Sequence, residues 1–453
     1  METNIDMMGW KEAKLRDLIC DFKRGIAYSS EEISSPNGIP MMNLASIDKT
    51  GYYREGEMKF YSGRYDEADK IYPDEMLIAC TDLTRDAIII GTPIKVPNES
   101  DFFLFTMDLA KLRPNDCIDP DFLYYALKIN TYRKYIKPWA SGTNVLHLNL
   151  NGVYNYTLKY PVSKNAQKSI ARILLNIDKK IAINKRINHY LEAMAKQLYD
   201  YWFVQFDFPD ANGKPYKSSG GNMIWNEKLK REIPEGWSSE IFSELCDINK
   251  LTLSKRDNIP TIEYLDTSSI TEGIVSETQY LDRHSAPSRA QRKVEDLTIV
   301  YSCVRPRLLH YGILCNPPTN FVVSTGFATI DAKDKAYSIL LYYFLISCEA
   351  TEHLGDIADT AVSSYPAINP SDIGSLRTIV PPRSLSLSFQ EKVEVMIREA
   401  KRLHLENKEL EKKRDYLLPL VMTGQVSVKQ LNNDLPLFRP ILYMFFIHKI
   451  LYL

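Results

Sequence analysis

Two long stretches with the same heptad spacing constrain this chain more than any other feature of its sequence. The first runs from Gln167 to about Phe203, and its seam residues follow one another at alternating steps of three and four. This spacing is typical of a long helix that packs lengthwise on a partner helix. The seam positions are Ile170, Ile173, Ile177, Lys180, Asn184, Ile187, Leu191, Met194 and Leu198.

The partner helix is predicted within the same chain. A second stretch repeats the spacing, and each of its positions lies 223 residues after its counterpart, as 393 − 170 and 421 − 198 both give. Its positions are Val393, Met396, Ala400, Leu403, Asn407, Leu410, Arg414, Leu417 and Val421. A coiled coil between the two stretches follows from the shared pattern.

Asn184 and Asn407 occupy matching places on the two seams. An Asn on an apolar seam lowers stability but fixes register, because its amide needs a polar group opposite. We therefore assign both to coiled-coil register. An ordinary amphipathic core helix is the alternative for either stretch alone, and the shared interruption favours the pair. About 35 residues at 1.5 Å each give a rod of roughly 50 Å, which indicates a spacer.

The rest of the chain divides into two globules, and each leads directly into one of the long helices. The first opens near Gly9-Trp10 and the second at Gly236-Trp237. The predicted boundaries are 9–163 for the first globule, 164–206 for the first long helix, 207–235 for a linker, 236–384 for the second globule, 385–424 for the second long helix and 425–453 for a tail.

Corresponding patterns in the two globules indicate one mixed α and β fold that occurs twice. Residues 75–81 and 296–302 are acidic-led apolar runs of strand length, and each precedes a loop that carries arginine. Residues 119–136 and 336–352 have helical patterns. The loops differ between the globules, and loops usually carry binding specificity. A duplication that serves only stability is the alternative.

Composition describes a soluble globular protein without a dominant electrostatic partner, since 45% of its 453 residues are hydrophobic and the net charge is −1. A local basic face remains compatible with this balance. Seven scattered cysteines argue against a disulfide framework and a zinc site, and favour a reducing cytoplasm. The first residues do not resemble a secretion signal. Charged residues and a proline interrupt the apolar segment 436–453, which favours a docking tail or an extension over a membrane anchor.

Sequence motifs of catalysis are not found in the chain. It has no phosphate-binding Gly-x-x-x-x-Gly-Lys loop, no Gly-x-Ser-x-Gly elbow and no His-Glu-x-x-His. Asn316-Pro317-Pro318 is similar to the base-clamping motif of amino-methyltransferases, but Thr319 stands where the motif needs an aromatic residue. A turn before a strand is the prediction for this segment.

The chain resembles a known family, the specificity subunits of type I restriction-modification enzymes. The resemblance is strongest for IARILLNIDKKIAINKRINHYLEAMAKQLYDYWF, for the connector that follows it and for ENKELEKKRDYLLPLVMTGQVSV. It covers the chain up to about Val428. The tail beyond Val428 has no place in the family pattern. Ser141-Gly142-Thr143-Asn144 is similar to a polar turn of the family, whereas the matching Ala361-Val362-Ser363-Ser364 lacks the Gly.

The resemblance implies an α+β fold with two similar mixed α/β target-recognition domains and two long helices that form an antiparallel coiled coil. Each domain would read one half of a split site in double-stranded DNA, with half-sites on the order of one DNA turn apart. Chemistry would belong to partners. Methylation subunits would use S-adenosylmethionine on adenine, and restriction subunits would use ATP and Mg²⁺. This chain would then be non-catalytic, cytoplasmic and free of cofactors.

DNA readout needs side chains that reach base edges or phosphates, chiefly Arg, Lys, Asn and Ser. We predict the DNA-binding residues in loops of the two globules, with Arg305 and Arg307 as the strongest pair because they flank a proline after a buried strand. The first globule's candidates are Arg24, Tyr28, Arg85, Lys137, Ser141, Thr143 and Asn144. The second globule's are Lys255, Arg256, Arg289, Arg292, Arg305, Arg307, Ser363, Ser364 and Tyr365.

Other hypotheses remain open beside the specificity subunit. The chain could be an enzyme with an unseen cofactor site, or the specificity module of a solitary methyltransferase without restriction. It could also be a scaffold whose coiled coil joins two protein-binding domains. The matched helices alone do not separate a scaffold from a DNA reader.

Overall fold

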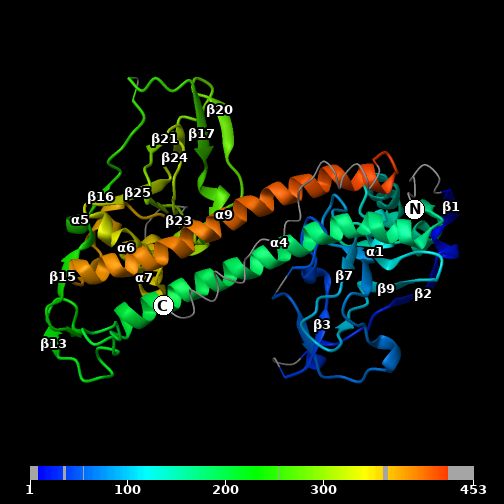
Figure 1. The fold of residues 1–453 in the computed structure, drawn as a ribbon, viewed down its shortest axis with the longest axis horizontal. Helices are drawn as coiled ribbons and strands as arrows, with labels where there is room; N and C mark the ends of the chain where they lie inside the picture. Colours follow the sequence, from blue (N-terminus) through cyan, green and yellow to red (C-terminus); the bar gives the residue numbers. More distant parts are fainter. Residues whose placement is uncertain (1–8, 34–36, 55, 255, 361–365, 427–453) are drawn as a thin grey trace, which may run out of the picture. The chain divides into compact units, whose positions relative to one another are not determined.

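The computed structural model describes residues 9–33, 37–54, 56–254, 256–360 and 366–426. The chain divides into two compact units, drawn in Figure 1. We call Met1–Ala182 with Asn407–Leu453 the first unit, and Ile183–Glu406 the second unit. Each unit therefore contains one globule and one part of each long helix.

The first unit is built on an antiparallel sheet of four strands in the order β2 (Ile19–Arg24), β9 (Leu109–Pro114), β5 (Met76–Ala79) and β7 (Pro93–Lys95). Its helices are α1 (Pro120–Ala126), α2 (Asn130–Ile136) and α3 (Leu150–Asn155). Ile78 of β5, Leu112 of β9 and Phe122 of α1 are buried in one core.

Smaller sheets complete the first unit. One has the order β4 (Lys59–Tyr61), β3 (Ile39–Met42) and β8 (Leu104–Phe105), and another the order β10 (Ala140–Ser141), β11 (Leu146–Leu148) and β6 (Thr81–Asp82). A third pairs β1 (Trp10–Lys14) with β12 (Thr157–Pro161).

The second unit repeats this plan. Its main antiparallel sheet has the order β16 (Cys246–Ile248), β25 (Phe327–Ala332), β22 (Ile299–Ser302) and β23 (Tyr311–Ile313). A second sheet has the order β20 (Gln279–Asp282), β17 (Thr261–Leu265), β24 (Phe321–Ser324) and β21 (Ala290–Lys293). The remaining pairs are β15 (Ser238–Ile241) with β26 (Arg377–Val380), β18 (Ile270–Thr271) with β19 (Ile274–Val275), and β13 (Met223–Asn226) with β14 (Arg231–Pro234). The helices are α5 (Phe242–Leu245), α6 (Ser338–Leu345), α7 (Cys348–Thr360) and α8 (Pro370–Ser375).

The internal repeat is visible in the strand order. Strands β2-β9-β5-β7 correspond to β16-β25-β22-β23, and the antiparallel and parallel partners of β3 correspond to those of β17. The two acidic-led apolar runs form β5 and β22, which are fully buried. Each predicted helical segment is two helices, because α1 ends at Ala126 before α2, and α6 ends at Leu345 before α7.

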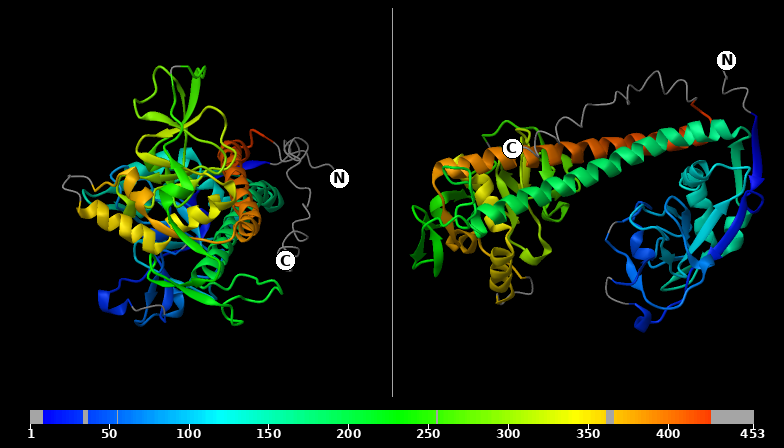
Figure 2. Two further views of the ribbon diagram at one scale, coloured as in Figure 1. Left: turned by 90° about the vertical axis from the view of Figure 1, so that its left-hand side faces the viewer. Right: turned by 60° about the horizontal axis from the view of Figure 1, so that its bottom comes forward.

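The two long helices are α4 (Lys164–Tyr199), which a π-helical turn extends to Val204, and α9 (Arg383–Met422). They run antiparallel within each unit, and Figure 2 shows their segments side by side. In the first unit Ile181 contacts Asn407 and Asp178 contacts Arg414. The predicted fold class is therefore confirmed.

The predicted seam of α9 is buried or half-buried at every position from Val393 to Val421. On α4 the buried face is shifted by one residue at several positions. Leu174, Ile181, Ala195 and Tyr199 are buried, whereas the predicted neighbours Ile173, Lys180, Met194 and Leu198 are half-buried. An ideal helix drifts from a strict heptad by about 20° per repeat, which accounts for such a shift.

Several predictions concern the ends and connectors of the chain. Residues 207–235, the predicted linker, contain the hairpin β13–β14. The apolar segment 436–453 lies outside the described residues. Among the helices that are described, none is long and apolar enough to cross a membrane. All seven cysteines are free thiols.

Candidate nucleic-acid interface

The loop that follows β5 has a backbone fixed by one buried carboxylate. We call residues 80–91 loop A. Asp82 is fully buried, and its Oδ1 accepts a hydrogen bond from the Thr84 backbone N–H at 2.7 Å. Its Oδ2 accepts from the N–H groups of Ile89 and Ile90 at 2.6 and 3.0 Å. Arg85, a predicted DNA-binding residue, therefore lies on a loop whose backbone is held on both sides of it by hydrogen bonds to Asp82.

Helix α2 and the residue after it also hold the backbone of loop A. Arg133 donates hydrogen bonds to the carbonyl oxygens of Ile88, at 2.6 Å, and Ile90. Lys137, which directly follows α2, donates from Nζ to the carbonyl of Asp86 at 3.0 Å. Lys137 is thus brought to the loop that carries Arg85, although the two residues are distant in sequence.

Strand pairing brings the predicted polar turn to the same place. In the sheet β10-β11-β6, Leu146 pairs with Asp82, and His147 pairs with both Thr81 and Ser141. The turn between β10 and β11 contains Thr143 and Asn144, and both are exposed, as is Ser141. Arg85, Lys137, Ser141, Thr143 and Asn144 therefore gather around loop A.

The remaining candidates of the first unit have different surroundings. Arg24 is the last residue of β2 and lies beside the thiol of Cys80, the first residue of loop A. Burial raises the pKa of this thiol to about 11, although the nearby guanidinium of Arg24 lowers it. The Arg24 Nε atom is buried and has no hydrogen-bond partner among the described residues. Tyr28 contacts Lys59 of β4, whose Nζ lies 4.5 Å from the ring centroid.

The second unit builds the same arrangement around residues 303–310, which we call loop B. The N–H of Ile368 donates to the carbonyl of Cys303 at 2.9 Å, as the N–H of Leu148 does to Cys80 at 2.8 Å. Arg305 N–H donates to the Pro366 carbonyl at 2.8 Å. The segment before Pro366 includes Ser363, Ser364 and Tyr365, which lie outside the described residues.

Arg307 has two acidic partners on α7. Its guanidinium contacts Asp356 at 2.6 Å and Asp359 at 3.0 Å. It also lies against Gly355, where a Cβ atom would come within 2.9 Å of Arg307 Cζ. The basic tip predicted for Arg305 and Arg307 is therefore neutralised at Arg307, whose contacts fix loop B to α7. Arg305 itself has a left-handed backbone with φ of 48°.

Of the other candidates of the second unit, two lie on or just before β21 and two lie at positions 255 and 256. Arg292 on β21 has a buried Nε, and its charge lies near Cys303, where burial raises the thiol pKa to about 11. Arg24 and Arg292 come from different sheets, but each has its positive charge near the cysteine that begins a loop, Cys80 or Cys303. Arg289 precedes β21, and Arg256 follows Lys255, which is outside the described residues.

Sequence reasoning missed the residues that shape these loops. The sequence analysis singled out neither Asp82 nor Arg133, whose hydrogen bonds hold the backbone of loop A. His147 was also missed, although it is exposed in the row Ser141–His147–Thr81. The only local signal was the alternation around His147, which favours a strand with one polar face.

The seam asparagines each bind a residue of the opposite helix within their own unit. Asn184 donates from Nδ2 to Glu406 Oε2 at 3.2 Å, and Asn407 donates to the Ile181 carbonyl at 3.4 Å. These contacts fit a role in register, which stays a prediction.

Two observations bear on catalysis. In the part of the chain that the structure describes, no group of three or more His, Cys, Asp or Glu side chains could hold a metal ion. The segment Asn316–Thr319 is a turn between β23 and β24, which confirms that prediction.

Comparisons with known proteins agree with the resemblance. Residues 7–193 match the family model of the type I restriction modification DNA specificity domain. The chain is 23% identical over 326 residues to the MjaIX specificity subunit of Methanocaldococcus jannaschii, an alignment that covers 70% of this chain and 72% of that protein. It is 23% identical over 395 residues to the HindI specificity subunit of Haemophilus influenzae, covering 74% and 84%.

A solved structure shares the fold. The S subunit of a type I restriction-modification system from M. genitalium aligns with a TM-score of 0.60 at 16% identity, covering 93% of this chain and 98% of that one.

Proposed function

We propose, on the premise that this chain belongs to the family of type I restriction-modification specificity subunits, that its two units each read one part of a bipartite DNA target. The observation that carries the proposal is the recurrence of one loop arrangement. Loops A and B follow equivalent buried strands and lie beside equivalent segments, yet they present different side chains. Two readers of different sequences need such a common frame with different loop surfaces.

In the first unit, the proposed contacts are Arg85, Lys137, Ser141, Thr143 and Asn144 around loop A. Arg and Asn suit guanine and adenine edges, and Lys and Ser suit phosphates. In the second unit, Arg305 and the segment 363–365 are proposed as contacts, and Arg307 as the residue that positions them. The long helices are proposed as the spacer between the two parts of the target.

The chemistry is proposed to lie in partner subunits. Methylation subunits would supply S-adenosylmethionine and the catalytic site for adenine, and restriction subunits would supply ATP- and Mg²⁺-dependent cleavage, in the cytoplasm. The chain itself would be non-catalytic. The alternative in which it serves a solitary methyltransferase differs only in the absence of restriction subunits.

Methylation mapping tests this function. The chain would be co-expressed with its methylation subunit in a host without other modification, and modified adenines would be located by single-molecule sequencing. We expect a split motif with two specified blocks around an unspecified gap. Replacing residues 9–163 by the same domain of a relative should change one block only.

Two results would contradict the proposal. A soluble complex that methylates no adenine, even when the chain is cut after Val428, would favour the scaffold hypothesis. Retention of labelled S-adenosylmethionine by the isolated chain would favour an enzyme with its own cofactor site.

A further inference from the structure

The hairpin β22–β23 connects loop B to a polar junction at its opposite end. The two strands pair from Ile299 with Ile313 to Tyr301 with Tyr311, and loop B closes the hairpin after Ser302. At the other end Leu297 N–H donates to the Leu314 carbonyl at 2.7 Å. We call residues 295–297 and 314–316 the hairpin base. Any displacement of this base moves loop B, because paired strands transmit shifts as a rigid element.

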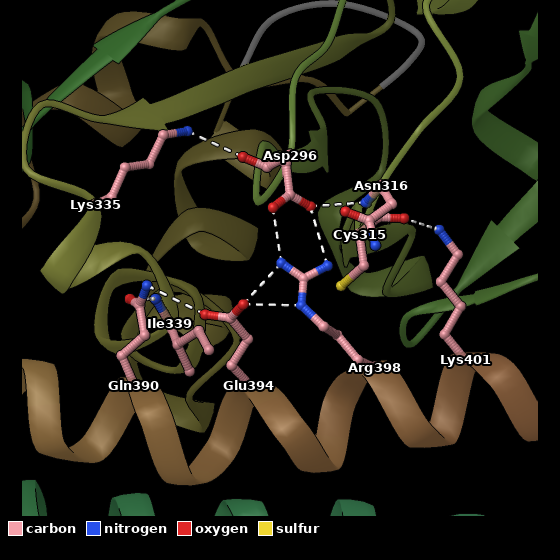
Figure 3. A network of polar contacts seen from close by, with 9 residues as sticks. All are labelled: Asp296, Cys315, Asn316, Lys335, Ile339, Gln390, Glu394, Arg398 and Lys401. Atoms are coloured by element: carbon pink, nitrogen blue, oxygen red, sulfur yellow. Dashed lines mark hydrogen bonds and ion pairs between the residues drawn. The ribbon is translucent and has the colours of Figure 1, made fainter.

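One arginine of α9 holds the hairpin base, as Figure 3 shows. Arg398 binds Asp296 with two parallel hydrogen bonds, Nη1 to Oδ1 at 3.2 Å and Nη2 to Oδ2 at 2.7 Å. Its Nε donates to Glu394 at 2.8 Å, which fixes the guanidinium on the helix. A bidentate fork of this kind fixes direction as well as distance.

Further contacts hold both segments of the hairpin base. Asp296 Oδ1 also accepts from the Asn316 N–H at 2.7 Å, so one carboxylate joins the residues before β22 to those after β23. Lys401, one turn along α9, donates to the Cys315 carbonyl, and Lys335 donates to the Asp296 carbonyl at 2.9 Å. Burial opposes ionisation of Asp296, but hydrogen bonds from Arg398 and Asn316 outweigh it and lower the pKa of this carboxyl.

The corresponding base in the first unit is held differently. There Glu75 binds Arg113 of β9 at 2.7 Å, and Lys95 binds Asp121 of α1. These partners belong to the globule itself, whereas Arg398 belongs to the long helix. The hairpin that carries loop B is therefore bound directly to α9.

We propose that Arg398 is a positioning residue for DNA recognition by the second unit: it fixes the base of the β22–β23 hairpin on α9 and thereby sets the place of loop B. The inference rests on the proposed function of loop B. An ion pair with 28% and 44% of its side chains exposed contributes little to stability, so its main effect is on geometry. Recognition of bases tolerates only small displacements of the reading group, which makes specificity the sensitive quantity.

The test uses the methylation complex and four variants of the full chain. Arg398→Lys keeps the charge without the fork, Asp296→Asn keeps the shape without the charge, and the third variant combines both. Arg402→Ala is the matched control, since Arg402 lies one turn further along α9 and forms ion pairs with Glu399 and Glu406 of the same helix. Methylation rates are compared on the cognate site and on sites with one substituted base pair in either block.

We expect the discrimination at the block assigned to residues 236–384 to fall by about tenfold in both single variants, with the other block unchanged. The double variant should be no worse than the single ones, because all three break the same contact. Equal loss at both blocks, or unchanged discrimination in every variant, would overturn the inference. Absence of any split motif with the unaltered chain would instead refute the proposed function.

Discussion

Asp74 and Leu297 lie 223 residues apart, as 297 − 74 gives, and both have a left-handed backbone with φ of 66°. Each N–H donates across the base of a hairpin, Asp74 to the Val96 carbonyl at 3.1 Å and Leu297 to the Leu314 carbonyl at 2.7 Å. L-residues rarely adopt this conformation because Cβ approaches the carbonyl oxygen. A shared strained residue before β5 and β22 indicates that the two globules repeat one backbone in detail, although their loops differ.

The conformation of Asp74 predicts an unusual order of stability. Asp74 is exposed, so replacing it changes little except backbone preference. Asp74→Gly should have a free energy of unfolding about 1 kcal/mol higher than Asp74→Ala, because only Gly adopts positive φ without steric cost. Urea denaturation measures the difference. Asp101, an exposed loop residue without positive φ, is the control, and there Ala should be at least as stable as Gly. If the Gly variant is more stable than the Ala variant at both positions, or at neither, the prediction is contradicted.

Gln167 should be more important for stability than its counterpart Gln390. Gln167 is fully buried, accepts from the Asp119 N–H at 2.6 Å and donates to the Pro161 carbonyl at 2.7 Å. Gln390 accepts from the Ile339 N–H at 3.5 Å. Gln167→Ala leaves buried backbone groups unpaired and should cost about 2–4 kcal/mol, and Gln390→Ala about half as much. Thermal unfolding of both variants measures the difference. Equal losses of stability would contradict the prediction that the shorter hydrogen bonds of Gln167 contribute more.

Arg307 should act through α7 rather than through a base. Arg307→Ala is expected to relax recognition in the second unit's block by about tenfold, because loop B loses its tie to Asp356 and Asp359. The double variant Asp356→Asn with Asp359→Asn should have the same effect, since it removes the same ion pairs and keeps the arginine. Methylation of substituted sites measures both.

A matched control for this pair is Glu352→Gln, which removes one charge from the same exposed side of α7. It should leave the discrimination unchanged. If the aspartate variant also leaves it unchanged while Arg307→Ala does not, Arg307 reads DNA directly.

Lys128 should make the first unit's stability depend on pH. Its Nζ donates to the Gly51 carbonyl at 2.6 Å and lies 3.5 Å from the Tyr52 ring centroid. Burial lowers its pKa from 10.5 to about 7. Below about pH 7 both the folded and the unfolded state carry the proton, so the destabilisation by the buried charge is complete. Above pH 7 the folded state loses this proton first, and the free energy of unfolding rises until the unfolded lysine titrates.

Between pH 7 and 9.5 this rise should amount to about 2–3 kcal/mol. Lys128→Met should abolish it, whereas Lys134→Met, at an exposed position of α2, should keep it. Urea denaturation at pH 7 and pH 9.5 gives the change in the free energy of unfolding for the unaltered protein and for each variant. A flat profile in the unaltered protein would mean that the faces of Tyr52 and Tyr124 stabilise the ammonium enough to offset its burial.

Local patterns in the sequence determined much of this protein. The heptad steps predicted α9 and its seam, and the offset of 223 residues predicted the repeat that the strand orders display. The apolar runs predicted β5 and β22. These features are encoded by residues near one another in the chain, since side chains three, four or two positions apart share one face of a helix or strand. The one-residue shift on α4 arose because a real helix does not keep a strict heptad.

Only the tertiary structure decided which candidates meet. The pairing of Leu146 with Asp82 brings the turn at Thr143 to loop A, and no local pattern encodes a contact across that sequence distance. The same holds for Arg307 with Asp356 and for Arg398 with Asp296, where each charged residue alone reads as a solvated surface group. Charge and exposure depend on the partners that folding brings close, so sequence proposes the residue types at a site while long-range packing assigns their roles.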